Sequence, residues 1–107
     1  MPKKPILLIN AQECPAGKEK EYNEWYNNHV SELFKFKGMK KAIRYKKVGG
    51  DENVPPYIAL YYFDSLADYE RYMASPEFET GTNLSGRPNG VKRKFRGQFE
   101  LIKSWER

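Results

Sequence analysis

The segment Tyr57–Phe63 constrains the fold of this chain most strongly. All of its residues are aliphatic or aromatic, and its only polar groups are tyrosine hydroxyls. Such a run is typical of a strand in the middle of a sheet, with other structure over both of its faces. A second apolar run, Ile6–Ile9, continues into Asn10 and Gln12 and predicts another central strand. The rest of the chain must therefore be arranged around these two segments.

Two further segments have the apolar spacing of amphipathic helices. In Lys18–Phe36, six residues fall on one side of a helical wheel: Tyr22, Trp25, Tyr26, His29, Val30 and Leu33. A shorter helix follows Ser65, whose distance from Asp68 is that of a capping box, and it ends before Pro76. His29 is the only histidine and lies mid-stripe. We therefore expect its imidazole beneath the first helix rather than in bulk water.

Two more strands complete the predicted order of elements. Met39–Val48 alternates and is dense in lysine, as expected at a sheet edge, where charge discourages wrong pairing. Phe95–Trp105 also alternates, whereas Thr80–Lys94 has no clear period and predicts a long loop, which would be a lid, a binding loop or a disordered segment. The order strand, helix, strand, strand, helix, strand is that of the α+β ferredoxin-like fold, βαββαβ, with an antiparallel four-stranded sheet.

Two helices can cover only one face of such a sheet. The other face keeps an apolar row in either register of Tyr57–Phe63, so we expect a second copy to pack on it and form a homodimer.

With 107 residues, the chain is expected to be one domain, 1–107. A single cysteine, Cys14, excludes an internal disulfide. The apolar run near the N-terminus is too short for a signal peptide or membrane span, so a cytoplasmic protein without membrane contact is expected.

Several short motifs are shared with a known family. Trp25–Val30, Gly38, Ala42–Tyr45, the strand Tyr57–Phe63 and Ser75–Glu77 together resemble the EthD-like group of dimeric α/β-barrel proteins. The resemblance implies two ferredoxin-like protomers whose sheets close into a barrel with the helices outside. Members of that superfamily include cofactor-independent monooxygenases, polyketide cyclases and dehydratases, lactone isomerases and haem-binding proteins.

The resemblance carries over most directly at one motif, an aromatic residue four positions before a histidine. Trp25 and His29 match it, whereas Ser31 and Lys37 stand where family members often have proline. The resemblance implies a pocket under the first helix for a small aromatic, polyketide-like or other hydrophobic metabolite. His29 would be the general base of an oxygenase, cyclase or isomerase. The other interpretation of His29, a core histidine with one hydrogen bond, is equally open.

Six further residues are candidates for binding the substrate: Asn10, Trp25, Tyr26, Arg44, Tyr61 and Tyr62. Aromatic residues at helical spacing also fit plain core packing, and Arg44 also fits a solvated sheet edge. The alternative function is a homodimer that binds a ligand without transforming it. Haem ligation by His29 is a further alternative, but the sequence predicts no cofactor and no metal ion, because a second histidine and paired cysteines are missing. Specific RNA binding is not expected, since the third strand lacks the glycine and basic residue of RNA-recognition modules.

Overall fold

The sheet is built around β1 (Ile6–Glu13) and β3 (Tyr57–Phe63), as the apolar runs predicted. In the computed structural model, which describes residues 4–107, four antiparallel strands follow the order β2-β3-β1-β4. The lysine-rich β2 (Met39–Lys46) lies at one edge and β4 (Lys92–Glu100) at the other. This topology is the ferredoxin-like fold. The predicted domain 1–107 begins with residues 1–3, which lie outside the described residues.

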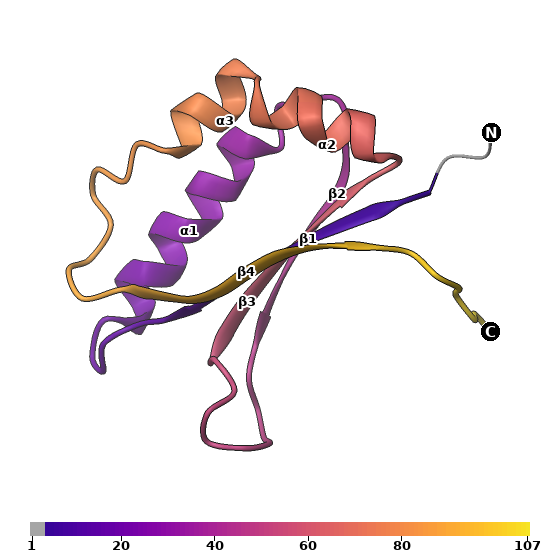
Figure 1. The fold of residues 1–107 in the computed structure, drawn as a ribbon. Helices are drawn as coiled ribbons and strands as arrows, with labels where there is room; N and C mark the ends of the chain where they lie inside the picture. The colour runs from indigo at the N-terminus through magenta and orange to yellow at the C-terminus, as the bar shows by residue number, and fades with distance from the viewer. Residues whose placement is uncertain (1–3) are drawn as a thin grey trace.

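Three helices lie on the same side of the sheet: α1 (Glu19–Leu33), α2 (Leu66–Met73) and α3 (Pro76–Gly81) (Figure 1). Ser65 caps α2: its hydroxyl accepts from the Asp68 backbone N–H at 3.2 Å, as the spacing predicted. The Asp68 carboxylate accepts from the Ser65 hydroxyl at 3.1 Å rather than from the Ser65 backbone N–H, so the second bond of a capping box is replaced. The α3 helix was not predicted. It begins because the Ser75 hydroxyl accepts from the Phe78 N–H and proline occupies its first turn. Within residues 4–107 no helix is long and apolar enough to cross a bilayer.

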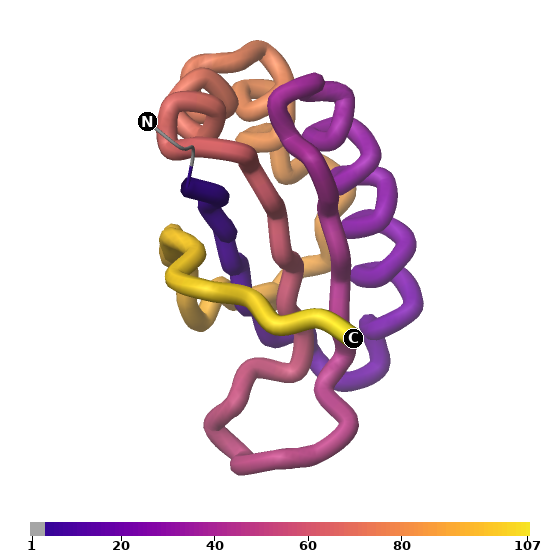
Figure 2. The backbone as a smooth tube through the Cα atoms, turned by 90° about the vertical axis from the view of Figure 1, so that its right-hand side faces the viewer, coloured from indigo at the N-terminus to yellow at the C-terminus, as the bar shows by residue number. Residues whose placement is uncertain are grey.

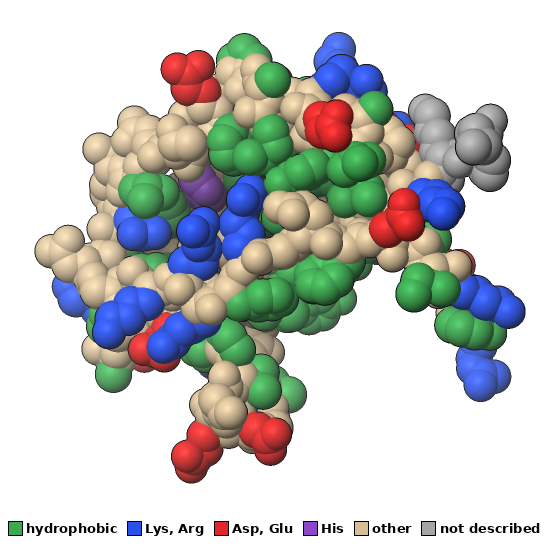
Figure 3. Space-filling model, viewed as in Figure 1, with side chains coloured by type: hydrophobic (Ala, Val, Ile, Leu, Met, Phe, Trp, Pro, Cys, Tyr) green, Lys and Arg blue, Asp and Glu red, His purple; other side chains and the backbone are tan. Residues whose placement is uncertain are grey.

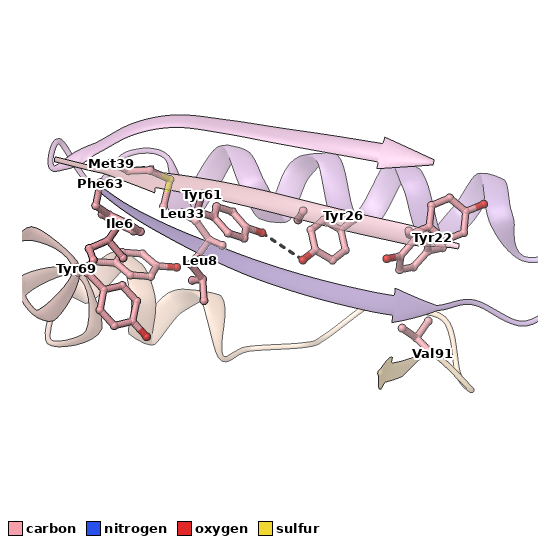
Figure 4. Close-up of a cluster of buried hydrophobic side chains, with 13 residues drawn as sticks. Ile6, Leu8, Tyr22, Tyr26, Leu33, Met39, Tyr61, Phe63, Tyr69 and Val91 are labelled. Carbon is pink, nitrogen blue, oxygen red and sulfur yellow. Dashed lines mark hydrogen bonds between the residues drawn. The ribbon is translucent and has the colours of Figure 1, made fainter. Parts of the chain in front are cut away.

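The hydrophobic core lies between these helices and one face of the sheet. Along β3 the burial alternates: Tyr57, Ala59, Tyr61 and Phe63 are buried, and the residues between them are only half-buried. Tyr22, Tyr26 and Leu33 of α1 pack on the buried set (Figure 4). Within residues 4–107 all helices pack on this face, as expected for two helices and one sheet, and the opposite face is the one on which the sequence predicted a second copy (Figure 1).

The last strand differs from its predicted bounds. β4 begins at Lys92 and ends at Glu100, whereas alternation suggested Phe95–Trp105. Pairing stops there because Glu100 is opposite Ile6, the first residue of β1, and only one further bond, from the Leu101 N–H to the Pro5 carbonyl, follows. Residues 101–107 are exposed and run away from the sheet (Figure 1). The connection between β2 and β3 also projects beyond the end of the sheet (Figure 2).

Candidate functional site

A cavity of about 490 Å³ lies between α1, α3 and the helix-covered face of the sheet. Five of the seven predicted site residues line it: Asn10, Trp25, Tyr26, His29 and Tyr61. Three elements supply them, because Asn10 comes from β1 and Tyr61 from β3, whereas the other three come from α1. Their convergence follows from the helical stripe facing the inner side of the two central strands.

The imidazole of His29 is surrounded by aromatic rings rather than by polar partners. The Trp25 ring stacks on it at 4.7 Å between centroids, and Tyr26 meets it edge-on at 5.4 Å. Burial lowers the pKa of His29, and the positive charge of Arg87 lowers it further. Within residues 4–107 neither ring nitrogen is hydrogen-bonded to the protein. The imidazole is therefore neutral at pH 7 and available to a molecule in the cavity.

The connection between α3 and β4 holds Trp25 in this position. The indole Nε1 donates to the Ser85 carbonyl at 2.9 Å, and Gly86, at a φ of +83°, lies against the same ring. On the other side of the cavity Gly81 packs against Leu33, and a Cβ there would lie 3.6 Å from His29 Cε1. A side chain at position 81 would therefore crowd both α1 and the imidazole.

A short chain of buried hydroxyl and amide groups lies deeper in the cavity wall. Tyr26 and Tyr61 share a hydrogen bond of 3.2 Å between their hydroxyls (Figure 4), and Asn10 Nδ2 donates to the Tyr26 hydroxyl at 3.3 Å. Asn10 Oδ1 is shielded from solvent and has no partner among the described residues. Burial raises the pKa of both phenols, so they stay protonated and can donate hydrogen bonds.

Arg44 and Tyr62 do not line the cavity. The Arg44 guanidinium lies over the Tyr26 ring, 4.5 Å from its centroid, and donates to the side-chain oxygens of Asn23 and Asn27, each at 2.8 Å. Arg44 thus joins β2 to α1. Tyr62 lies on the opposite face of the sheet from Tyr61, because neighbouring residues of a strand point to opposite faces, and Lys41 lies near its ring. The cavity is therefore lined by Tyr61 and not by Tyr62.

Sequence reasoning missed several residues of the cavity wall: Gln12, Tyr72, Phe78, Leu84, Arg87, Arg93 and Arg96. The one available signal was the run of basic residues that begins at Lys92, at the end of a segment with no period from which a side-chain direction could be assigned. Figure 3 shows the histidine side chain in a hollow with Lys and Arg side chains beside it. Among residues 4–107 no group of His, Cys, Asp and Glu side chains could hold a metal ion.

Comparison with known proteins adds evidence at the level of structure. No protein-family model matches the sequence, and no curated protein matches it either. The chain is similar to SnoaB, a cofactor-independent oxygenase from Streptomyces nogalater, with 11% identity, coverage of 94% of this chain and 96% of that chain, and a TM-score of 0.70. An EthD family protein from Bacillus halodurans has 16% identity, coverage of 92% and 99%, and a TM-score of 0.68.

A third similar structure is a dimeric ferredoxin-like protein of unknown function from Thermobifida fusca. Its identity is 12%, the coverage is 92% of each chain, and the TM-score is 0.60. These similarities confirm the predicted fold along nearly the whole chain, and an EthD family protein is among the neighbours, as the sequence resemblance predicted. At such identities they establish the fold alone.

Proposed function

We propose that this chain binds a small aromatic compound in the cavity under α1, and that His29 removes a proton from an enolisable carbon or a phenol of that compound. The observation that carries the proposal is a neutral imidazole that borders the cavity with no protein hydrogen bond. His29 is half-buried, and because none of the described protein groups bonds its ring nitrogens, they stay open to a molecule in the cavity. The similarity in fold to SnoaB, described as a cofactor-independent oxygenase, supports chemistry of this kind.

The proposed reaction begins with proton transfer to His29. The electron pair of the broken C–H or O–H bond stays on the substrate and gives an enolate or phenolate. The Tyr26 and Tyr61 hydroxyls and the nearby Arg87 guanidinium are the groups that can stabilise this negative charge. If this anion is reprotonated at another carbon, the protein is an isomerase. If the anion attacks a carbonyl group of the same molecule, the protein is a cyclase. If it transfers an electron to O₂, the protein is an oxygenase.

Proton exchange tests the role of His29 without knowledge of the natural substrate. We expect the protein to accelerate exchange of the benzylic protons of 2-tetralone with D₂O, measured by NMR. His29→Gln should slow the catalysed exchange by roughly 10²–10⁴-fold. The matched control is Glu24→Gln, an exposed position of α1, which should leave the rate unchanged. Binding of the ketone with equal exchange in the wild type and His29→Gln would favour the non-catalytic alternative.

We further propose that the chain is a homodimer joined through the outer face of the sheet. Ile58, Leu60 and Tyr62 are only half-buried there, and the neighbouring Phe95 and Phe99 are 43% and 47% exposed. A continuous apolar face of this kind is characteristic of an interface, and the similar protein from Thermobifida fusca is described as dimeric. Sedimentation equilibrium tests this proposal, and a stable monomer at micromolar concentration would contradict it.

A further inference from the structure

Three arginines line the same cavity as His29. Arg87 comes from the connection between α3 and β4, and Arg93 and Arg96 come from β4, whereas no aspartate or glutamate lines the cavity. Within residues 4–107 the arginine that pairs with a carboxylate is Arg71, on α2. Three cations gathered at one cavity without an acidic side chain repel one another, and an anion from outside would relieve that repulsion.

A β-bulge directs two of these arginines to the same face of the sheet. Residues three apart in a regular strand point to opposite faces, so Arg93 and Arg96 would normally diverge. Here Arg96 is opposite Asn10 and Arg93 is opposite Gln12, both of which face the helices, and Lys94 is the extra residue between them. The bulge therefore places the exposed Arg93 at the cavity wall together with Arg96, a recognised use of bulges beside functional sites.

The aromatic walls of the cavity lie close to these charges. The positive charge of Arg87 adds to the lowering of the pKa of His29 by burial. Arg87 and Arg96 oppose the rise that burial causes in the pKa of Tyr26 and of Tyr72, respectively. Among residues 4–107 the side chain of Arg96 donates to the Met73 sulfur, at 3.7 Å, which is a weak acceptor. Its guanidinium therefore keeps most of its donors for a ligand.

We infer that the ligand of this cavity is a small aromatic acid, whose carboxylate is bound by Arg93 and Arg96 while its ring lies toward Trp25 and His29. This inference rests on the proposed function and names the class of compound. A carboxylate suits a pair of guanidinium groups because it accepts hydrogen bonds in parallel. The cavity of about 490 Å³ admits a compound of two or three fused rings.

Two probes that differ only in the carboxylate test the inference: 1-hydroxy-2-naphthoate and 1-naphthol. By isothermal titration calorimetry we expect the acid to bind at least about tenfold more tightly, as a charge-assisted hydrogen bond would give. Arg93→Gln and Arg96→Gln should each weaken binding of the acid by roughly tenfold and leave naphthol binding within about twofold. Arg93→Lys, which retains the charge without the planar donors, should fall between the wild type and Arg93→Gln.

The matched control is Lys94→Gln, which removes one positive charge from the same strand at the bulge. Lys94 pairs with Glu13 at 3.5 Å and does not line the cavity, so its variant should keep the wild-type affinity for the acid. Equal affinity for the two probes, or equal weakening of both by the arginine variants, would overturn the inference. Tighter binding of 1-naphthyl phosphate than of the acid would overturn the choice of a carboxylate.

The outcomes also separate this inference from the proposed function. Exchange of 2-tetralone that depends on His29, without a preference for the acid, would contradict the inference alone. A preference for the acid that depends on the arginines, without exchange, would contradict only the role of His29 as a base. Failure of both probes and of 2-tetralone to bind would contradict both.

Discussion

Tyr26 is the centre of the hydrogen-bonded chain in the cavity wall, and removing its hydroxyl should cost more stability than the same change at Tyr61. The Tyr26 hydroxyl is bonded both to the Tyr61 hydroxyl and to Asn10 Nδ2. Tyr26→Phe removes one oxygen but leaves two groups without their partners. Tyr61→Phe leaves Tyr26 bonded to Asn10, so only one hydrogen bond is lost.

The expected magnitudes follow from the burial of these groups. Tyr26 and Tyr61 are 2% and 3% exposed, so the Tyr61 hydroxyl would be unpaired and shielded in Tyr26→Phe, at a cost of about 1–3 kcal/mol. Tyr26→Phe also removes the acceptor of Asn10 Nδ2. Because Asn10 is only half-buried, we expect this second loss to add about 1 kcal/mol. We therefore expect Tyr26→Phe to lower the free energy of unfolding by about 2–4 kcal/mol and Tyr61→Phe by about 1 kcal/mol.

Urea unfolding at a fixed protomer concentration measures both values, because the stability of an oligomer depends on concentration. For a chain of this size, about 1 kcal/mol lowers the melting temperature by roughly 4–8 °C, so the two variants should also be separated by thermal melting. Tyr45→Phe, at a residue 53% exposed, is the control and should change little. Equal losses for Tyr26→Phe and Tyr61→Phe would refute the reasoning and would indicate that water in the cavity satisfies Asn10.

Three other predictions concern the histidine and the dimer. Because His29 is the only histidine, its pKa can be measured directly by NMR titration. We expect a pKa below the ordinary 6.5 in the free protein and a higher pKa when 1-hydroxy-2-naphthoate is bound. A pKa above 6.5 in the free protein would contradict the site. Because the pKa of His29 is lower in the folded than in the unfolded chain, the unfolded chain binds more protons as the pH falls below about 6.5. The free energy of unfolding should therefore decrease as the pH falls from about 7 through the folded pKa of His29. Urea unfolding should show a smaller loss of free energy of unfolding between about pH 7 and pH 5 for His29→Gln than for the wild type. Equal losses in the two proteins would argue against a contribution of His29. Leu60→Glu on the outer sheet face should give monomers in sedimentation equilibrium with unchanged circular dichroism, whereas an intact dimer would exclude that face as the interface.

The sequence determined most of the fold by itself. The two apolar runs are the central strands, the lysine-rich segment is an edge strand, and the stripe of α1 faces the sheet. These features depend on the periodicity of side chains along one segment, which is visible without knowledge of any neighbour. The same stripe predicted that His29 lies beneath α1, next to Trp25 and Tyr26.

Only the tertiary structure decided which residues share the cavity. Tyr61 and Tyr62 are adjacent residues of the same type, so the sequence does not say which of them faces the helices. The pairing of β3 with β1 places Tyr61 on the helix-covered face. Arg93 and Arg96 reach that face together because the bulge at Lys94 changes the alternation of β4. Such choices depend on how strands far apart in the sequence pair with one another, and local hydrophobic pattern carries no information about that pairing where a segment has no period.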